Sequence, residues 1–242
     1  MITNKDFIKN FITNNKDKSV PYRWTHGATD YHLGDGLLIY AIIQYMRAKT
    51  CVCLGSGGGF IPRIMSQARK DLYEQEIFEG NSEWNWGDIG STIIVDADNG
   101  VGGETDWTNE DSFLRKNFYP RIILETTENA YYNFFVKEDI KIDYLHIDAD
   151  HSYEGVKLDF ELYSKILSPN GIISIHDTDI NYSKNHIITK DVSDQDHHED
   201  YANGPAKFIK EINKDWQRFD LFNEGIFPSK PSSTGLTLLR RA

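Results

Sequence analysis

Acidic and imidazole side chains follow two stretches of the chain that have the composition of buried strands, residues 142–147 and residues 171–175. The candidates are Asp148, Asp150, His151, His176 and Asp177. The carboxyl ends of parallel strands meet at one edge of an open α/β sheet, and that edge is where such sheets bind ligands. Carboxylates there can hold a divalent cation, and imidazoles, whose pKa lies near neutrality, can transfer protons. The pattern predicts a metal site or an acid–base site.

The elements that would position these residues alternate between strand and helix. Apolar runs predict strands at residues 50–54, 92–95, 121–124, 142–147 and 171–175. Helical patterns precede or separate them at residues 37–48, 60–76, 112–118, 128–137 and 153–167. Thr127 is the expected cap of the fourth of these helices, and the Ser-Pro-Asn-Gly run at 168–171 is expected to be a turn. Such alternation is typical of a parallel sheet with right-handed crossovers.

The last forty residues have a different pattern. A helix at 205–213 is followed by strand-like segments at 219–227 and 234–241, which predict a C-terminal antiparallel hairpin. The expected fold is therefore α/β, a Rossmann-like three-layer αβα sandwich with a mostly parallel sheet that ends in this hairpin.

A glycine-rich turn follows the first predicted strand. Gly55, Gly57 and Gly59 let the backbone turn tightly and approach a ligand where a Cβ would clash. Position 60 is Phe, so the pattern is G-x-G-x-G and not the dinucleotide pattern G-x-G-x-x-G. The tighter form suits a nucleoside without a phosphate, and a turn without any ligand is the alternative.

An acid follows the second predicted strand. Asp96 lies where a carboxylate can accept hydrogen bonds from ribose hydroxyls. It is farther from the glycines than the usual spacing of about 20 residues. Asp98 is a competing candidate, and a role in a surface loop is the alternative for either residue.

Composition restricts the class of protein. The chain has 242 residues, of which 39% are hydrophobic and 13% aromatic, so a full core is expected. The formal net charge of −11 argues against nucleic acid as the main partner, because phosphates would be repelled. The N-terminus lacks an apolar secretory segment and no run reaches membrane-spanning length, so we expect a cytoplasmic protein without a membrane partner. Cys51 and Cys53 lie two apart on one strand and are expected to be core residues.

The segment IDADHSYEGVKLDFELYSKILSPNGIISIHDT, together with the glycine turn and the acid after the second strand, resembles class I S-adenosylmethionine-dependent methyltransferases. Its D-x-D-H-S-Y-E-G and H-D-T elements look like the bacterial macrocin, mycinamicin and novobiocin sugar O-methyltransferases and the cephalosporin hydroxylase-like proteins. The resemblance covers roughly residues 50–178. It implies a seven-stranded sheet with an antiparallel strand near its end.

The resemblance also implies site residues. S-adenosylmethionine would contact Gly55, Ser56, Gly57, Gly59, Asp96 and Thr127. A divalent cation, Mg²⁺ or Mn²⁺, would be held by Asp148, His176 and Asp177. His176 and Cys53 both stand where relatives often have an acid. Because imidazole suits Zn, Mn or Fe better than Mg, the identity and the existence of the metal stay open.

The chemistry of methyl transfer gives these residues two alternative roles. A hydroxyl acceptor of high pKa needs either a cation that lowers its pKa or a general base. Asp148 with Asp177 would hold the cation, whereas His151 or His176 would take the proton directly. The catalytic candidates are therefore Asp148, His151 and His176. For Asp150 and His151, capping of the helix that begins near Tyr153 is the structural alternative.

The function expected from these observations is O-methylation of a small polar acceptor by S-adenosylmethionine. A sugar hydroxyl, in a natural product or a surface glycan precursor, is the leading acceptor. One alternative is a catalytically inactive nucleotide-binding or scaffolding protein of the same fold, and the other is a nicotinamide-dependent oxidoreductase. A homo-oligomer stays open.

Two further segments are assigned by position. Residues 1–48 are expected to form a helical and aromatic N-terminal cap on the methyltransferase domain at 49–242. Its segment around Tyr22, Trp24 and His26 would either line an acceptor pocket or pack as aromatic core. The polar segment at about 178–203 follows the fifth strand and would be either a lid over the acids or a solvated loop.

Overall fold

A computed structural model of the chain describes residues 26, 28, 33–57, 59–78, 92–97, 110–179, 203–221 and 234–242. Most of the first 32 residues of the predicted N-terminal cap, Asp98, and all but the ends of the predicted lid lie outside the described residues. The division at residue 48 stays a prediction.

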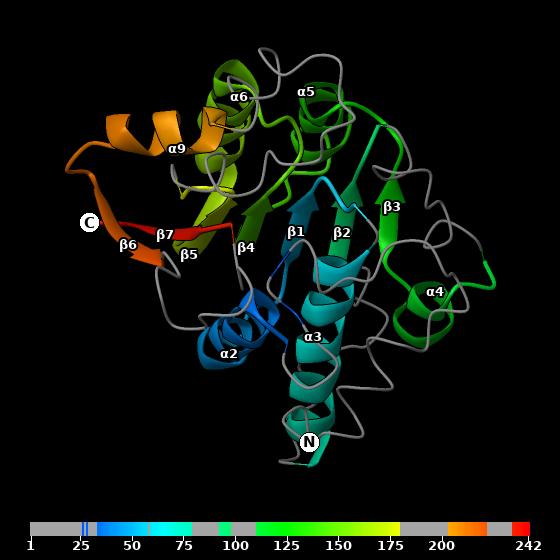
Figure 1. The fold of residues 1–242 in the computed structure, drawn as a ribbon. Coiled ribbons are helices and arrows are strands. Elements are labelled where there is room, and N and C mark those ends of the chain that lie inside the picture. Colours follow the sequence, from blue (N-terminus) through cyan, green and yellow to red (C-terminus); the bar gives the residue numbers. More distant parts are fainter. Residues whose placement is uncertain are drawn as a thin grey trace, which may run out of the picture.

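A seven-stranded sheet forms the centre of the fold (Figure 1). The strands are β1 (Cys51–Leu54), β2 (Thr92–Val95), β3 (Arg121–Ile123), β4 (Ile142–Ile147), β5 (Leu167–His176), β6 (Trp216–Leu221) and β7 (Leu236–Arg241). They lie in the order β3-β2-β1-β4-β5-β7-β6. Strands β1 to β5 pair in parallel, whereas β7 is antiparallel to both β5 and β6. The predicted Rossmann-like fold with a terminal antiparallel hairpin is confirmed.

Helices cover both faces of the sheet and complete the three layers (Figure 1). One face carries α2 (Asp35–Met46), α3 (Phe60–Phe78) and α4 (Phe113–Phe118). The other carries α5 (Thr127–Ala130), the π-helix η4 (Tyr131–Phe135), α6 (Tyr153–Tyr163), the 3₁₀ turn η5 (Ser164–Ile166), α9 (Gly204–Phe208) and the 3₁₀ turn η6 (Ile209–Glu211). Each face therefore has its own hydrophobic cluster.

Strand β1 shows why the central strands are continuously apolar. Cys51 and Cys53 pack into the cluster of α2 and α3, whereas Val52 and Leu54 pack into the opposite cluster. Side chains alternate between the faces of a strand, so a strand covered on both faces needs an apolar residue at every position. Both cysteines are free and buried, as expected of core residues.

Two local predictions are wrong. Residues 168–171 do not form a separate turn, because they lie within β5. Its pairing with β4 starts at Leu167 and shifts register before it resumes at Ile172, so these polar residues form an irregularity inside the strand. Thr127 is not the cap of α5, because Oγ1 of Thr126 accepts the hydrogen bond from the backbone N–H of Asn129 at 3.3 Å.

Candidate active site

The loop after β1 has the backbone that its glycines predict. The φ angles are +75° at Gly55, +46° at Gly57 and +80° at Gly59, a region that side chains with a Cβ rarely adopt. The N–H of Gly55 donates to the carbonyl oxygen of Val95 at 2.9 Å, which fixes the loop against the end of β2. The loop thus begins at the carboxyl edge of the sheet.

The same loop touches the end of β4. A Cβ on Gly55 would lie 2.1 Å from the carbonyl oxygen of Asp148, which is far inside van der Waals contact. The N–H of Asp148 donates to the carbonyl oxygen of Leu54 at 2.9 Å. The glycine loop and the first of the predicted acids are therefore in direct backbone contact.

Asp96 anchors the glycine loop to β2. Its Oδ2 accepts hydrogen bonds from the backbone N–H of Ser56 at 2.9 Å and from the Ser56 hydroxyl at 2.6 Å. Hydrogen bonds to a carboxylate are stronger than those between neutral groups. The predicted cofactor residues Gly55, Ser56, Gly57, Gly59 and Asp96 therefore form one connected unit.

Thr127 lies apart from that unit, in the contact between α5 and α6. Its carbonyl oxygen accepts from the Tyr163 hydroxyl at 2.7 Å, and its side chain is hydrogen-bonded to the buried carboxyl group of Asp159. These contacts give Thr127 a packing role, and its assignment to the cofactor stays a prediction.

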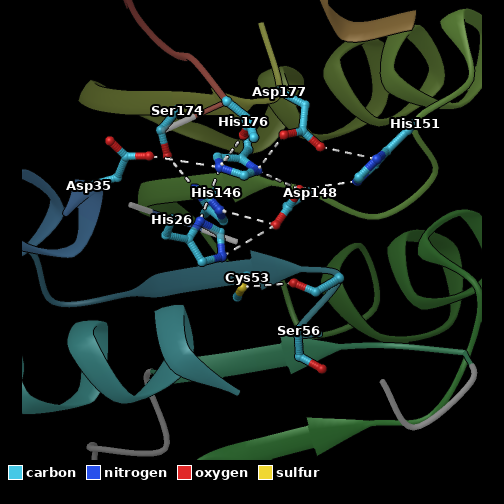
Figure 2. Close-up of polar contacts among 12 residues, drawn as sticks. His26, Asp35, Cys53, Ser56, His146, Asp148, His151, Ser174, His176 and Asp177 are labelled. Carbon is cyan, nitrogen blue, oxygen red and sulfur yellow. Dashed lines mark hydrogen bonds and ion pairs between the residues drawn. The ribbon is translucent and has the colours of Figure 1, made fainter. Parts of the chain in front are cut away.

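Imidazoles and carboxylates from four parts of the chain meet at the ends of β4 and β5 (Figure 2). We call this group the His–Asp cluster; its members are His26, Asp35, His146, Asp148, His151, His176 and Asp177. The cluster brings together all of the predicted catalytic and metal residues. It also contains three residues for which the sequence predicted no catalytic or metal-binding role: His26, which was a candidate for the acceptor pocket, Asp35 and His146.

Asp148 lies at the centre of the His–Asp cluster, and its two oxygens face different imidazoles (Figure 2). Oδ1 is 3.1 Å from Nδ1 of His176 and 3.2 Å from Nε2 of His151. Oδ2 faces Nε2 of His26 at 3.8 Å and Nε2 of His146 at 3.9 Å. One carboxylate therefore has an outer, hydrogen-bonded side and an inner side with longer contacts.

Asp177 completes the outer side. Its φ angle of +57° is unusual for a residue with a side chain. Oδ1 of Asp177 is 3.2 Å from Nδ1 of His176, and Oδ2 is 3.1 Å from Nδ1 of His151. Both imidazoles are thus placed between Asp148 and Asp177.

The outer imidazoles carry positive charge. Burial disfavours the charged form of His176, but the negative charges of Asp177 and Asp148 outweigh it and raise its pKa to about 10. Burial also opposes the charge of His151, and the bond to Asp148 raises its pKa to about 9. Burial would raise the pKa of Asp148, yet the neighbouring imidazoles hold it well below its usual range.

The inner imidazoles are neutral. Burial, followed by the charge of His176, lowers the pKa of His26 well below its ordinary value. Burial is also the main cause of the lowered pKa of His146, which has no exposed surface. The His–Asp cluster therefore pairs two charged imidazoles with two neutral ones across a single carboxylate.

The sequence gives a signal for only one of the three additional members of the His–Asp cluster. His146 precedes Asp148 by two residues, so the alternation of the strand places both on one face, and the sequence contained this information. His26 and Asp35 lie upstream of the sheet, where the backbone N–H of Asp35 donates to the carbonyl oxygen of His26 at 2.9 Å. Nδ1 of His26 reaches Nε2 of His176 at 3.1 Å across 150 residues of sequence, a contact that no local pattern predicts.

Asp150 is not a member of the His–Asp cluster. Its Oδ1 accepts from the backbone N–H of Ser152 at 2.8 Å, and Ser152 caps α6 by accepting from the N–H of Gly155 at 3.0 Å. The helix-start role considered for Asp150 therefore agrees with the structure, with Ser152 as the cap itself.

Three sets of ligand atoms in the described residues are close enough to share a metal ion, each set lying within 4.8 Å. They are Asp148–His151–Asp177, His26–His146–Asp148 and His26–Asp35–His176. The predicted trio Asp148–His176–Asp177 is not among them, and His151 replaces His176 beside the two acids. The assignment of His176 as a ligand stays a prediction.

A family model described as a methyltransferase domain matches residues 52–178, which contain the glycine loop and most of the His–Asp cluster. The chain belongs to this methyltransferase family. The predicted recognition as a class I S-adenosylmethionine-dependent methyltransferase is confirmed, whereas the sugar-specific subgroup stays a prediction.

Solved structures with the methyltransferase fold cover nearly the whole chain. An O-methyltransferase from Bacillus cereus in complex with S-adenosylhomocysteine has a TM-score of 0.58 at 12% identity and covers 97% of both chains. The O-methyltransferase TomG from Streptomyces achromogenes, solved with S-adenosylmethionine, has a TM-score of 0.56 at 9% identity and covers 98% of this chain and 89% of that one. At such identities the likeness concerns the fold.

A short sequence match adds no function. A segment of 43 residues, 18% of the chain, is 44% identical to the uncharacterized protein y4gI of Sinorhizobium fredii and spans 5% of that protein. Within the described residues, no helix has both the length and the apolar character needed to cross a bilayer. The cytoplasmic location, the exclusion of nucleic acid and the oligomeric state stay predictions.

Proposed function

We propose that this methyltransferase transfers the methyl group of S-adenosylmethionine to a hydroxyl group of a small polar acceptor, with a sugar hydroxyl as the leading candidate. The observation that carries the proposal is the contact between Gly55 and Asp148, which joins the glycine loop to the His–Asp cluster. A methyl donor on the loop and an acceptor beside the acids would then be neighbours, as direct transfer requires.

The glycine loop and Asp96 would hold the cofactor. The glycines carry no Cβ that would block a ligand from the loop backbone. A Cβ on Gly57 would have no atom of the described residues within 4 Å, so there is open space beside the loop in this part of the structure. When bound, S-adenosylmethionine supplies a methyl group that its sulfonium has already activated. The protein then has to orient the acceptor and help it lose a proton.

The outer carboxylates would orient the acceptor hydroxyl. Asp148 and Asp177 offer carboxylate oxygens as hydrogen-bond acceptors on one sheet edge, and the side chain of Asp148 retains 16% exposure. With pKa values of about 9 and about 10, His151 and His176 are protonated at neutral pH. They would therefore stabilise negative charge that develops on the acceptor oxygen. Neither can accept a proton while it carries its own, so the proton of the hydroxyl would pass to the carboxylate that orients it, or on to water.

A divalent cation fits the outer set Asp148–His151–Asp177. Two carboxylate oxygens and one imidazole nitrogen within 4.8 Å form a mixed donor set, which suits Mn²⁺ or Zn²⁺ better than Mg²⁺. Such a cation would lower the pKa of an acceptor hydroxyl and replace the proton of His151.

Cofactor binding gives the first test. S-adenosylhomocysteine should raise the thermal unfolding temperature of the full chain, whereas NADH should leave it unchanged. Stabilisation by NADH alone would exclude the proposal and favour the oxidoreductase.

Methyl transfer to a panel of sugars and sugar conjugates gives the second test. Activity that a chelator abolishes and Mn²⁺ restores would support the outer cation. Activity that survives chelation would mean that the two acids and the charged imidazoles act on the acceptor hydroxyl without a cation. Cofactor binding without transfer to any acceptor would favour the inactive binding protein.

A further inference from the structure

The inner side of Asp148 has a geometry that hydrogen bonding does not explain. Oδ2 lies 3.8 Å from Nε2 of His26 and 3.9 Å from Nε2 of His146. Both separations exceed the range of about 2.7–3.2 Å for hydrogen bonds between nitrogen and oxygen. The three atoms nevertheless converge, since one ligand atom from each residue lies within 4.8 Å of the others.

His146 provides an independent indication of a ligand. Its side chain has no exposed surface, and its Nε2 has no hydrogen-bond partner among the described residues. Buried polar atoms without a partner are rare in folded proteins, because they lose hydration without compensation. Figure 2 shows that this nitrogen points toward Asp148.

The hydrogen bonds around Ser174 determine which form of His146 is present. The Ser174 hydroxyl donates to the carbonyl oxygen of Leu145 at 3.2 Å and accepts from the Tyr144 hydroxyl at 2.8 Å. Its one hydrogen is then used, so Nδ1 of His146, at 2.8 Å, must donate to it. A neutral imidazole protonated at Nδ1 presents a lone pair at Nε2, which is the form that binds metals.

His26 has a matching outer partner. Its Nδ1 lies 3.1 Å from Nε2 of His176, which the Thr234 hydroxyl also contacts at 2.9 Å. Because His176 is charged, its Nε2–H donates and Nδ1 of His26 accepts. An ion bound at Nε2 of His26 would displace one proton, which leaves Nδ1 of His26 as the donor to Nε2 of a neutral His176 and fixes the ring. The ring is further held by stacking on Phe60 at a centroid distance of 5.7 Å.

We propose that His26, His146 and Asp148 bind a first-row transition-metal ion, of the class of Zn²⁺ or Co²⁺, on the inner side of the His–Asp cluster. Two imidazole nitrogens and one carboxylate oxygen are a common ligand set for Zn²⁺ in open sites, and they disfavour Mg²⁺. Ligand atoms that lie about 2.0–2.1 Å from a tetrahedral metal ion are about 3.4 Å from one another. Small side-chain rotations would therefore bring the three ligand atoms, now 3.8 Å and 3.9 Å apart across Asp148, to binding distance.

The inner site differs from the outer cation set Asp148–His151–Asp177 in two of its three residues. An ion bound at the inner site would link His26, upstream of α2, to His146 on β4. Its existence does not depend on methyl transfer, because ion binding can be measured without cofactor or acceptor. Failure of one proposal is therefore distinguishable from failure of the other.

The test uses the full chain after removal of metal by a chelator. Zn²⁺ affinity is measured by competition with a chromophoric chelator, and Co²⁺ is added to record its visible absorption. Wild-type protein is expected to bind one tight equivalent with the absorption of a nitrogen-ligated, low-symmetry Co²⁺ ion. His146→Gln and His26→Gln should each lower the affinity by more than about 100-fold, since each removes a ligand.

Matched variants identify the set that binds. His151→Gln removes a ligand of the outer set alone, and Asp35→Asn removes one of the third set alone, so both should keep the affinity within about threefold. Circular dichroism checks the fold of every variant. If His146→Gln fails to fold, His26→Gln on a separate segment decides the result.

Several outcomes would overturn the proposal. They are the absence of a tight equivalent in the wild type, a loss of affinity in His151→Gln or Asp35→Asn as large as in the inner variants, and unchanged affinity in a folded inner variant.

Discussion

The backbone of Gly55 lies so close to Asp148 that a Cβ at residue 55 would come within 2.1 Å of the Asp148 carbonyl oxygen. This contact couples the glycine loop to the centre of the His–Asp cluster. It also means that the loop depends on the backbone of Asp148, whereas the cluster depends on its side chain. Substitutions can therefore separate the two roles.

Replacement of Gly55 should destabilise the fold strongly. Gly55→Ala places a Cβ against the Asp148 carbonyl oxygen and forces a residue with a side chain to adopt a φ of +75°. We expect a loss of more than about 2 kcal/mol in the free energy of unfolding, measured by urea denaturation. Gly57→Ala is the matched control, because its Cβ would meet no atom of the described residues within 4 Å, and it should lose only about 1 kcal/mol. Equal losses would contradict the predicted clash.

Replacement of the Asp148 side chain should remove activity without removing the cofactor. Asp148→Asn keeps the backbone contact with Gly55 but loses the charge that faces the imidazoles. We expect the methyl-transfer rate to fall by about 10²- to 10⁴-fold, with the affinity for S-adenosylhomocysteine unchanged within about threefold.

Asp150→Asn is the control for Asp148→Asn. Asp150 is exposed and its Oδ1 accepts from the N–H of Ser152, a bond that an amide oxygen can also accept. Its rate should stay within about twofold of the wild type. A similar loss of rate in both variants would refute a special role for Asp148.

Removal of the Asp96 carboxylate should weaken cofactor binding. In the wild type, the N–H and the hydroxyl of Ser56 both donate to Oδ2 of Asp96, and Asp96→Ala removes this acceptor. Hydrogen bonds to charged groups contribute about 1.5–3 kcal/mol, so we expect the affinity for S-adenosylhomocysteine to fall by about 10- to 100-fold in calorimetric titrations. Ser56→Ala loses one of the two bonds and should weaken binding less. The opposite order would show that Asp96 does not act through the loop.

The free energy of unfolding should decrease as the pH becomes alkaline. The pKa values of about 9 for His151 and about 10 for His176 exceed the ordinary value of 6.5, so both imidazoles bind a proton more tightly in the folded state. Their contribution is complete below pH 6.5, decreases above it, and is lost once the pH has passed the folded-state pKa values. The free energy of unfolding should therefore fall between about pH 6.5 and about pH 10.

The control for this pH dependence is His151→Gln, which removes one of the two titrating groups. Its free energy of unfolding should fall less steeply across the same range. A wild-type free energy that stays constant from neutral to alkaline pH would contradict the charged state assigned to both imidazoles.

Local sequence was sufficient for the outer half of the site. Asp148, His176 and Asp177 were predicted to meet because parallel neighbouring strands bring their carboxyl ends to one edge. His146 follows from the same strand, since a residue two positions before Asp148 shares its face. Element limits were less certain, because adjacent residues such as Thr126 and Thr127 can both cap a helix, and only the backbone geometry distinguishes them.

The sequence by itself determined the alternating fold, the glycine loop and the acids at the sheet edge, because these depend on periodicity and on strand ends. Only the tertiary structure decided that His26 and Asp35, from upstream of the sheet, complete the His–Asp cluster. It also decided which imidazoles are charged, since burial and the carboxylates opposite each ring set the pKa of His151 and His176. Long-range contacts and desolvation depend on the whole packed chain, and no short segment contains them.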